Sequence, residues 1–265
     1  MSMRRTRRAL CALTFLAMHA TPARSQSLAD RIAAVKNGLV GFHFAARPGI
    51  CGDGQHFIRM GRSYIGNTFD NMRDLTCVPG PVQVRLTMRE GAVERLEYWA
   101  GPLRERDGQS LGLISTAEAV RFLMSVATLA SGSPSARAIL PAVLADSAIV
   151  WPALVTIARD TDTRSQATRQ EAMLWLSRFA AGALVGRPSD PTVGEDDDDD
   201  RPKGGDLKTH AVFVLSQLRN REGVPALLDI ARSNPDRHVR SQALFWLGQS
   251  GDPRALNLFE SILRS

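Results

Sequence analysis

A helical pattern repeats in the second half of the chain, and this repeat constrains the fold more than any other feature of the sequence. Residues 211–217 (AVFVLSQ) match residues 243–249 (ALFWLGQ) at a shift of 32, and residues 151–159 (WPALVTIAR) match residues 224–232 (VPALLDIAR). From about Ser115 onward, apolar residues recur with the period of a helix. The unit is therefore predicted to be a helical hairpin of roughly 30 residues. Because one hairpin cannot bury its apolar stripe alone, the hairpins should stack into an α-solenoid.

The turns between the predicted helices carry residues that typically end and begin helices. Gly251 can end one helix, Asp252 can cap the next, and Pro253 fits its first turn, where a missing N–H group costs nothing. Each helix also has an apolar stripe that we expect to face inward. These stripes are Ala211, Val214, Leu215 and Leu218; Val224, Leu227, Leu228 and Ala231; Val239, Ala243, Trp246 and Leu247; and Ala255, Phe259, Ile262 and Leu263.

The most regular stretch of the repeat resembles a known family. The stretch RHVRSQALFWLGQSGDPRALNLFESIL is similar to bacterial HEAT repeats of the short type also grouped with phycobilisome-lyase-like repeats, in its basic residue, Ala, Leu-Gly, Gly-Asp-Pro and Leu-rich helix. The likeness is good over residues 206–265, moderate over 148–182 and limited to the pattern over 115–147. This resemblance implies a stacked two-helix solenoid that holds other proteins, and it implies no particular activity. Beyond the repeat pattern, nothing in the sequence supports the bilin attachment of the lyase members.

The first 25 residues have the pattern of a secretory signal. Four arginines within residues 1–8 precede an apolar run at 9–20, which is too short to span a bilayer, and cleavage is expected after Ser25. A buried N-terminal helix is the alternative interpretation. The chain has a net charge of +6, but residues 1–25 contain five Arg and no acidic residue. The remainder carries 28 basic against 27 acidic residues, so global charge gives no reason to expect a nucleic-acid partner.

Two cysteines remain after the predicted cleavage, Cys51 and Cys77. In an exported chain, two thiols with no third competitor most simply form a disulfide. Metal binding is an alternative, because His43 and His56 lie close by in sequence and Cys with His is a zinc ligand set. Free thiols are a second alternative. We expect the disulfide to stabilise a small domain over residues 26–110.

The sequence of this first domain indicates β-structure. Apolar residues alternate with polar ones around residues 40–44 and again over 82–88, and Glu90 with Gly91 supplies a turn into a returning strand. Tyr98 and Trp99 fit a strand end that closes a small core better than a platform for stacking a ligand. The glycines of residues 52–54 (GDG) predict a turn, with a weak anion cradle as the alternative.

Three basic residues are candidates for contacting a partner. Arg169, Lys208 and Arg240 fall at one repeat-equivalent position, so a basic column could run along the solenoid. The alternative is that these side chains bridge neighbouring repeats through hydrogen bonds to helix ends.

An acidic insertion interrupts the repeat over residues 186–206. Six consecutive acidic residues repel one another and favour a solvated loop, with weak cation binding or docking of a basic partner as alternatives. These residues are Glu195, Asp196, Asp197, Asp198, Asp199 and Asp200.

The sequence predicts a mainly α fold, with a signal at residues 1–25, a small β-rich domain with a Cys51–Cys77 disulfide at 26–110, and a HEAT-like α-solenoid at 115–265. Motifs of nucleophilic, zinc-dependent and phosphate-binding enzymes are absent. We therefore expect an exported, periplasmic or extracellular, monomeric adaptor that binds another protein without a cofactor, nucleic acid or membrane span. One alternative is a metal-dependent or hydrolytic enzyme that uses Cys51, His43, His56 and Cys77. The other is a binder of a small ligand or an envelope polymer.

Overall fold

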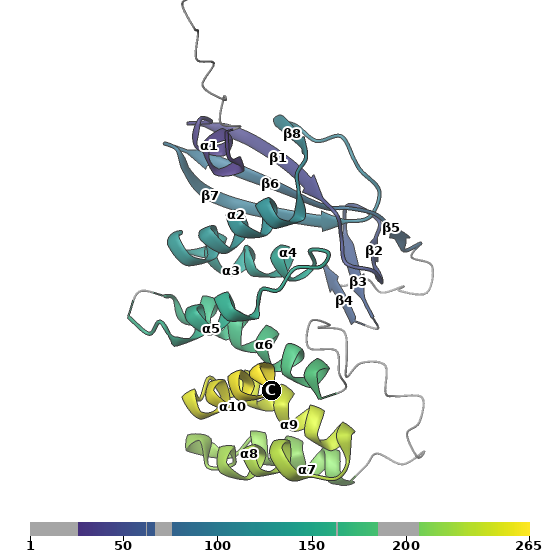
Figure 1. Ribbon diagram of the computed structural model, residues 1–265, viewed down its shortest axis with the longest axis vertical. Helices are drawn as coiled ribbons and strands as arrows, with labels where there is room; N and C mark the ends of the chain where they lie inside the picture. The colour runs from purple at the N-terminus through teal and green to yellow at the C-terminus, as the bar shows by residue number, and fades with distance from the viewer. Residues whose placement is uncertain (1–25, 62, 67–75, 163, 185–206) are drawn as a thin grey trace, which may run out of the picture.

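The computed structural model describes residues 26–61, 63–66, 76–162, 164–184 and 207–265 (Figure 1). These residues form a β-rich N-terminal part and a helical C-terminal part, and about half of them are helical. The fold is thus less dominated by helices than the mainly α prediction. The predicted signal at 1–25 and the acidic run at 195–200 lie outside the described residues.

The first sheet has four strands in the order β7-β6-β1-β8. These strands are β1 (Gly38–Phe44), β6 (Val82–Arg89), β7 (Ala92–Ala100) and β8 (Gln109–Leu113). The predicted hairpin is confirmed as β6–β7, and both of its turn residues have positive φ, 53° at Glu90 and 80° at Gly91. Such a turn matches the twist of the strands that it joins. Strand β8 pairs parallel to β1, whereas the other pairs are antiparallel.

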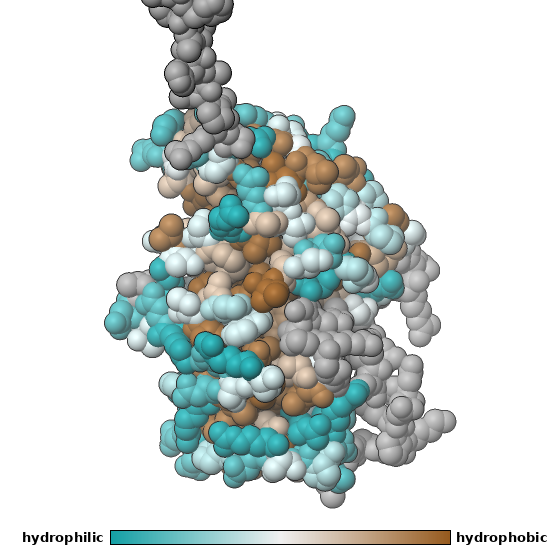
Figure 2. All heavy atoms as spheres, in the orientation of Figure 1, coloured by the Kyte–Doolittle hydropathy of each residue, from teal (hydrophilic) through white to brown (hydrophobic). Residues whose placement is uncertain are grey.

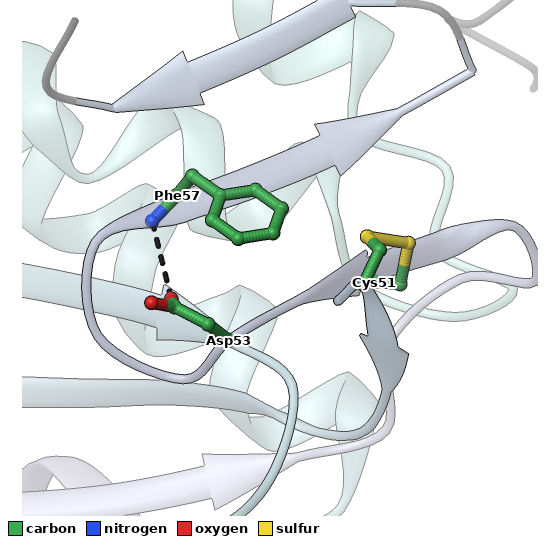
Figure 3. The surroundings of a disulfide bond; sticks show 4 residues. Cys51, Asp53 and Phe57 are labelled. Atoms are coloured by element: carbon green, nitrogen blue, oxygen red, sulfur yellow. Dashed lines mark hydrogen bonds between the residues drawn. A yellow bond between two sulfur atoms is a disulfide. The ribbon is translucent and has the colours of Figure 1, made fainter. Parts of the chain in front are cut away.

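The second sheet is smaller and has the order β4-β3-β2-β5. Its strands are β2 (Ile50–Gly52), β3 (Phe57–Met60), β4 (Ser63–Gly66) and β5 (Val78–Pro79). The predicted disulfide joins Cys51 in β2 to Cys77, directly before β5, with 5.3 Å between their Cα atoms (Figure 3). The bond therefore fastens the two strands at one edge of this sheet.

Four short helices lie on one face of the first sheet (Figure 1). They are α1 (Leu28–Ala33), α2 (Thr116–Leu129), α3 (Ser133–Arg137) and α4 (Ile139–Val143). The ring of Phe42 meets Phe122 of α2 edge to face at 5.9 Å, and Arg137 donates to the carbonyl of Leu96 in β7. The apolar residues of sheet and helices form one continuous core. The helical pattern that begins near Ser115 therefore first covers the sheet and only then continues into the hairpins.

The remaining helices pack against one another in pairs. They are α5 (Trp151–Arg159), α6 (Gln166–Ala183), α7 (Leu207–Ser216), α8 (Val224–Ser233), α9 (Arg237–Ser250) and α10 (Pro253–Arg264), with a 3₁₀ turn at Arg219–Arg221. Figure 1 shows α9 and α10 between the α5–α6 hairpin and the α7–α8 hairpin. Helices α7 to α10 thus stack in chain order, whereas the step from α6 to α7 passes over one hairpin.

The α9–α10 hairpin packs on the α5–α6 hairpin with α10 antiparallel to α5. Trp151 at the start of α5 lies under Arg264 at the end of α10, and Arg159 at the end of α5 pairs with Glu260. Helix α9 likewise packs closely on α6, since a Cβ atom built on Gly248 would lie 2.6 Å from Oγ of Ser177. The Leu-Gly of the repeat pattern is therefore the point at which these two helices come into contact.

Three of the four predicted inward stripes are buried almost throughout, and the stripe on α7 is wrong. Val214 and Leu218 are 47% and 43% exposed, whereas Val212 of this helix is buried. Helix α7 is the last element of the stack, so it has neighbours on one side only (Figure 1). A terminal helix keeps part of its repeat pattern without a partner to cover it.

The turn between α9 and α10 is capped as predicted, and α9 has a cap of its own. Gly251 is left-handed at φ 61°, and the side chain of Asp252 accepts from the backbone N–H of Arg254. Asp236 caps α9 through the N–H groups of its first turn. None of the helices in the described part of the chain has the length and apolar composition that crossing a membrane requires.

Candidate functional site

A groove opens where the α5–α6 hairpin meets the α9–α10 hairpin. Its cavity has a volume of about 490 Å³, and residues from four helix ends line it. Arg159 ends α5, Gln166 begins α6, Ser250 ends α9 and Pro253 begins α10. The antiparallel packing of the two hairpins brings these ends together.

Three arginines and one carboxylate give the groove its charge. Arg159, Arg169 and Arg221 line it, together with Asp252. Asp252 is 4% exposed and both of its oxygens accept from the guanidinium of Arg254 at 3.0 Å. This hydrogen bonding, helped by the nearby charge of Arg221, holds the pKa of the Asp252 carboxyl below its usual range although burial acts to raise it. The one carboxylate of the groove is therefore neutralised by a cation outside it.

The three arginines differ in how far they are already engaged. Arg159 pairs with Glu260, and Arg169 donates from Nη1 to the backbone carbonyl of Arg164 at 2.5 Å. Arg221 forms neither a hydrogen bond nor an ion pair within the described residues. Its backbone is left-handed at φ 60°, as is that of Asn220 before it at φ 54°. Such a conformation is uncommon outside glycine and is often found at binding sites.

The rest of the groove combines an apolar floor with amide groups. Met173 and Leu256 contribute buried side chains, and the exposed amides of Gln166, Gln170 and Asn257 border them. Guanidinium groups bind carboxylates through paired, charge-assisted hydrogen bonds, and side-chain amides can bond to a peptide backbone. In Figure 2, hydrophilic side chains also cover much of the lower helices, with apolar patches between them. The arrangement suits an acidic peptide segment.

A comparison with protein families identifies the helices beside this groove. Residues 197–265 match a family described as HEAT repeats. The C-terminal part of the chain is a HEAT-repeat domain. Neither a search of curated proteins nor a search of solved structures gives a match to this chain. The matched HEAT repeats include α7 to α10, the helices that stack in chain order, so the groove lies where they meet α5 and α6.

The three predicted partner-binding residues occupy separate places around the HEAT repeats. Arg169 lines the groove. Arg240 donates from Nη1 to the carbonyl of Asn234 at 2.6 Å, which is the hydrogen bond to a helix end that the alternative interpretation predicts. It lies in the first turn of α9, ten residues or about 15 Å of helix away from Ser250 at the groove. Lys208 lies in the first turn of α7. The structure therefore brings only Arg169 into the groove.

Sequence reasoning missed Arg159 and Arg221. Arg159 had a signal, because residues 151–159 repeat at 224–232, where Arg232 is equivalent. Arg221 carried no signal in the repeat pattern, since it lies in the 3₁₀ turn between α7 and α8. Both residues line the groove because the last hairpin of the HEAT repeats, α9–α10, packs on α5–α6.

The residues of the predicted enzyme alternative are dispersed in the N-terminal part. Cys51 and Cys77 are joined in the disulfide, so neither thiol is available to a metal in this state. His43 lies on β1, where burial lowers its pKa, and His56 follows the turn after β2. A cluster of three or more His, Cys, Asp or Glu side chains with metal-binding geometry was not found in the described ranges. The acidic residues 195–200, named as weak cation ligands, lie outside them.

The glycine turn at residues 52–54 forms an internal anion site rather than an open one. The carboxylate of Asp53 accepts from the backbone N–H groups of Gln55 and His56, and from Nδ1 of His56 at 2.7 Å. It also accepts from the backbone N–H of Phe57, the bond drawn in Figure 3. Burial acts to raise the pKa of Asp53, but these hydrogen bonds together hold it well below its usual range. The donors that a cradle would offer to a ligand are thus already used by the chain itself.

Proposed function

We propose that this chain is an exported adaptor that holds another protein and catalyses no reaction. In this proposal the helical part works as a short HEAT-repeat solenoid, and the groove between α5–α6 and α9–α10 binds an acidic segment of the partner. HEAT repeats are commonly protein-interaction modules, which supports the proposal. The Cys51–Cys77 disulfide is consistent with an oxidising compartment.

The observation that carries the proposal is the charge of the groove. Arg159, Arg169 and Arg221 surround an apolar floor, and Asp252 is already neutralised by Arg254. Arg221 in particular has all of its donors available to a ligand within the described structure. Burying such a charge beside a partner's carboxylate gains a strong, directional interaction, whereas a basic or apolar partner would leave it unpaired.

The direct test is binding of a fluorescein-labelled peptide of alternating Glu and Leu residues, measured by fluorescence anisotropy at 50 mM salt. We expect saturable binding to the full mature chain, and about tenfold weaker binding to Arg221→Gln and to Arg169→Gln. Arg232→Gln is the matched control, because Arg232 is an exposed arginine of α8 that does not line the groove. A Lys and Leu peptide of the same length should not bind.

The adaptor hypothesis is then tested with the native partner. The mature chain and the double variant Arg169→Gln/Arg221→Gln serve as baits in an envelope extract, read by mass spectrometry. A stoichiometric protein that the mature chain retains and the double variant loses would support both the adaptor function and the groove. If the acidic peptide does not bind, or if both baits retain the same proteins equally, the groove is not the binding site.

A further inference from the structure

A second cavity lies in the β-rich part, on the face of the first sheet that the helices leave free. Strands β7 and β8 are opposite edges of this sheet, so the connection between them must cross it. Residues 101–108 make this crossing and enclose a cavity of about 450 Å³ against β1 and β6. This size is within the range of small-molecule sites.

The crossing and the hollow beneath it are held by particular residues. Gln83 is 5% exposed, and its amide donates to the carbonyl of Pro102 at 3.0 Å while its oxygen accepts from the backbone N–H of Arg104. Gly41 is the residue of β1 opposite Arg85, so no side chain fills the sheet surface there. A Cβ atom on Gly108 would lie 2.5 Å from Leu39, so only glycine permits the connection to come this close.

Three arginines face this cavity. Arg106 stacks on Trp99, with 3.5 Å between its guanidinium carbon and the ring centre. The guanidinium carbon of Arg85 lies 5.3 Å from the centre of the same ring. Burial lowers the pKa of Arg106, and the charges of Arg85 and Arg104 lower it further, against an opposing effect of Glu97. The cluster thus holds mutually repelling cations that a single carboxylate offsets only in part.

Each of these guanidinium groups keeps unused donors. Arg85 bonds to Glu97 through Nε and Nη2, and Arg104 uses the same two nitrogens on the carbonyl of Asp53. Arg106 donates from Nη2 to the carbonyl of Gly54, while its Nε is buried and lacks a partner within the described part of the chain. Nη1 of each arginine has no acceptor within the described residues, so these donors are available to an anion that enters the cavity.

The other ionisable groups of the cavity do not compensate the arginines. Glu105 and Asp107 also line it, but both are in the exposed connection, and neither forms an ion pair with Arg85, Arg104 or Arg106 in the described structure. His43 borders the cavity from β1, and burial lowers its pKa, which disfavours the charged form of the imidazole.

We infer that this cavity is an oxyanion site, in which Arg106, Arg85 and Arg104 bind the phosphate or carboxylate group of a small molecule and Trp99 holds Arg106 in place. The inference is independent of the proposed adaptor function, because none of these residues belongs to the helical groove. It also gives Trp99 a role that its position at a strand end does not require.

The test is a titration of the full mature chain with inorganic phosphate and, separately, with citrate, at constant ionic strength, followed by tryptophan fluorescence. Because Trp99 contacts Arg106, we expect a saturable change, and the anion with the lower dissociation constant indicates whether phosphate or carboxylate is preferred. Arg106→Gln should bind at least about tenfold more weakly. Arg95→Gln, an exposed arginine four residues before Trp99 on β7, should bind like the unaltered chain.

A second measurement needs no variant, in case Arg106→Gln does not fold. In a ¹⁵N spectrum of the unaltered chain, the Nε–H resonance of Arg106 should shift when phosphate or citrate is added, because an anion bound at Nη1 changes the charge distribution of the whole guanidinium group. Absence of saturation with both anions, equal binding by Arg106→Gln, or an unmoved Arg106 resonance would overturn the inference. The groove double variant Arg169→Gln/Arg221→Gln should retain anion binding, which separates this result from that of the adaptor test.

Discussion

Replacing Gly248 by alanine tests the contact that builds the groove. Gly248 lies where α9 crosses α6, and a Cβ atom at this position would be 2.6 Å from Oγ and 2.7 Å from Cβ of Ser177, and 3.2 Å from the carbonyl oxygen of Met173. Ser177 is 1% exposed, and its hydroxyl donates to the carbonyl of Leu174, so it has no room to move away. The two helices must therefore separate to accept one methyl group.

Two opposing effects decide the size of the change. Alanine is favoured over glycine in a helix by about 1 kcal/mol, which acts to stabilise the variant. Overpacking a closed interior typically costs about 1–3 kcal/mol, and contacts below 3 Å to a fixed Cβ atom belong at the upper end of this range. The net prediction for Gly248→Ala is a loss of about 1–2 kcal/mol in the free energy of unfolding, or roughly 3–6 °C in Tm.

The assay is urea and thermal unfolding followed by circular dichroism, with Gln249→Ala on the exposed side of α9 as the control. Ser177→Gly alone should destabilise by about 0.5 kcal/mol through helix propensity, because serine lies between alanine and glycine on this scale. In the double variant the added methyl group finds space, so the two changes should together cost at least about 1 kcal/mol less than their sum. If Gly248→Ala is as stable as the parent, or if the two changes are additive, α9 does not pack on α6 in this manner.

Other regions give further expectations. Replacing Cys51 and Cys77 by serine should lower the free energy of unfolding by about 3.5 kcal/mol in the chain-entropy treatment, and urea unfolding of the parent with a reductant should show the same loss; equal stability would contradict a structural disulfide. The pKa of Asp53 is depressed in the fold, so the stabilisation from its carboxylate is complete above the unfolded pKa of about 3.9 and is lost as pH falls toward the folded value. Below about pH 4, urea midpoints should therefore fall more steeply for the parent than for Asp53→Asn. Val214→Ser on α7 should change stability by less than about 0.5 kcal/mol, whereas Leu227→Ala on α8 should cost about 2–4 kcal/mol; similar costs at both positions would show that α7 is covered.

Local features of this fold could be predicted from the sequence because neighbouring residues determine them. The β6–β7 turn follows from Glu90 and Gly91, and the start of α10 follows from Asp252 and Pro253. The disulfide was predictable because only Cys51 and Cys77 follow the predicted cleavage site, so a disulfide between them has one possible pairing. The period of 3.6 also located the helices after Ser115.

The order of the hairpins could not be predicted in this way. A repeat pattern shows that each apolar stripe needs a neighbour, but any equivalent stripe can supply it, so the pattern does not fix which hairpin lies next to α6. The stripe on α7 illustrates this, because Val214 matches the half-buried Trp246 in sequence and is exposed at the end of the stack. For the same reason the repeat alignment indicated Arg169 and could not show that Arg221 lies beside it.

The antiparallel packing of the α5–α6 and α9–α10 hairpins also determines which helix-end charges border the groove. The N-terminal ends of α6 and α10 and the C-terminal ends of α5 and α9 all border the cavity. Partial positive charges at the two N-terminal ends and partial negative charges at the two C-terminal ends therefore offset one another there. The proposed preference for an anion therefore depends on the arginine side chains. Two of the three lie outside the matched HEAT repeats, and the third lies in the 3₁₀ turn between α7 and α8. The repeat architecture thus accounts for the presence of a groove, whereas its positive charge comes from Arg159, Arg169 and Arg221, on which the proposed binding of an acidic partner depends.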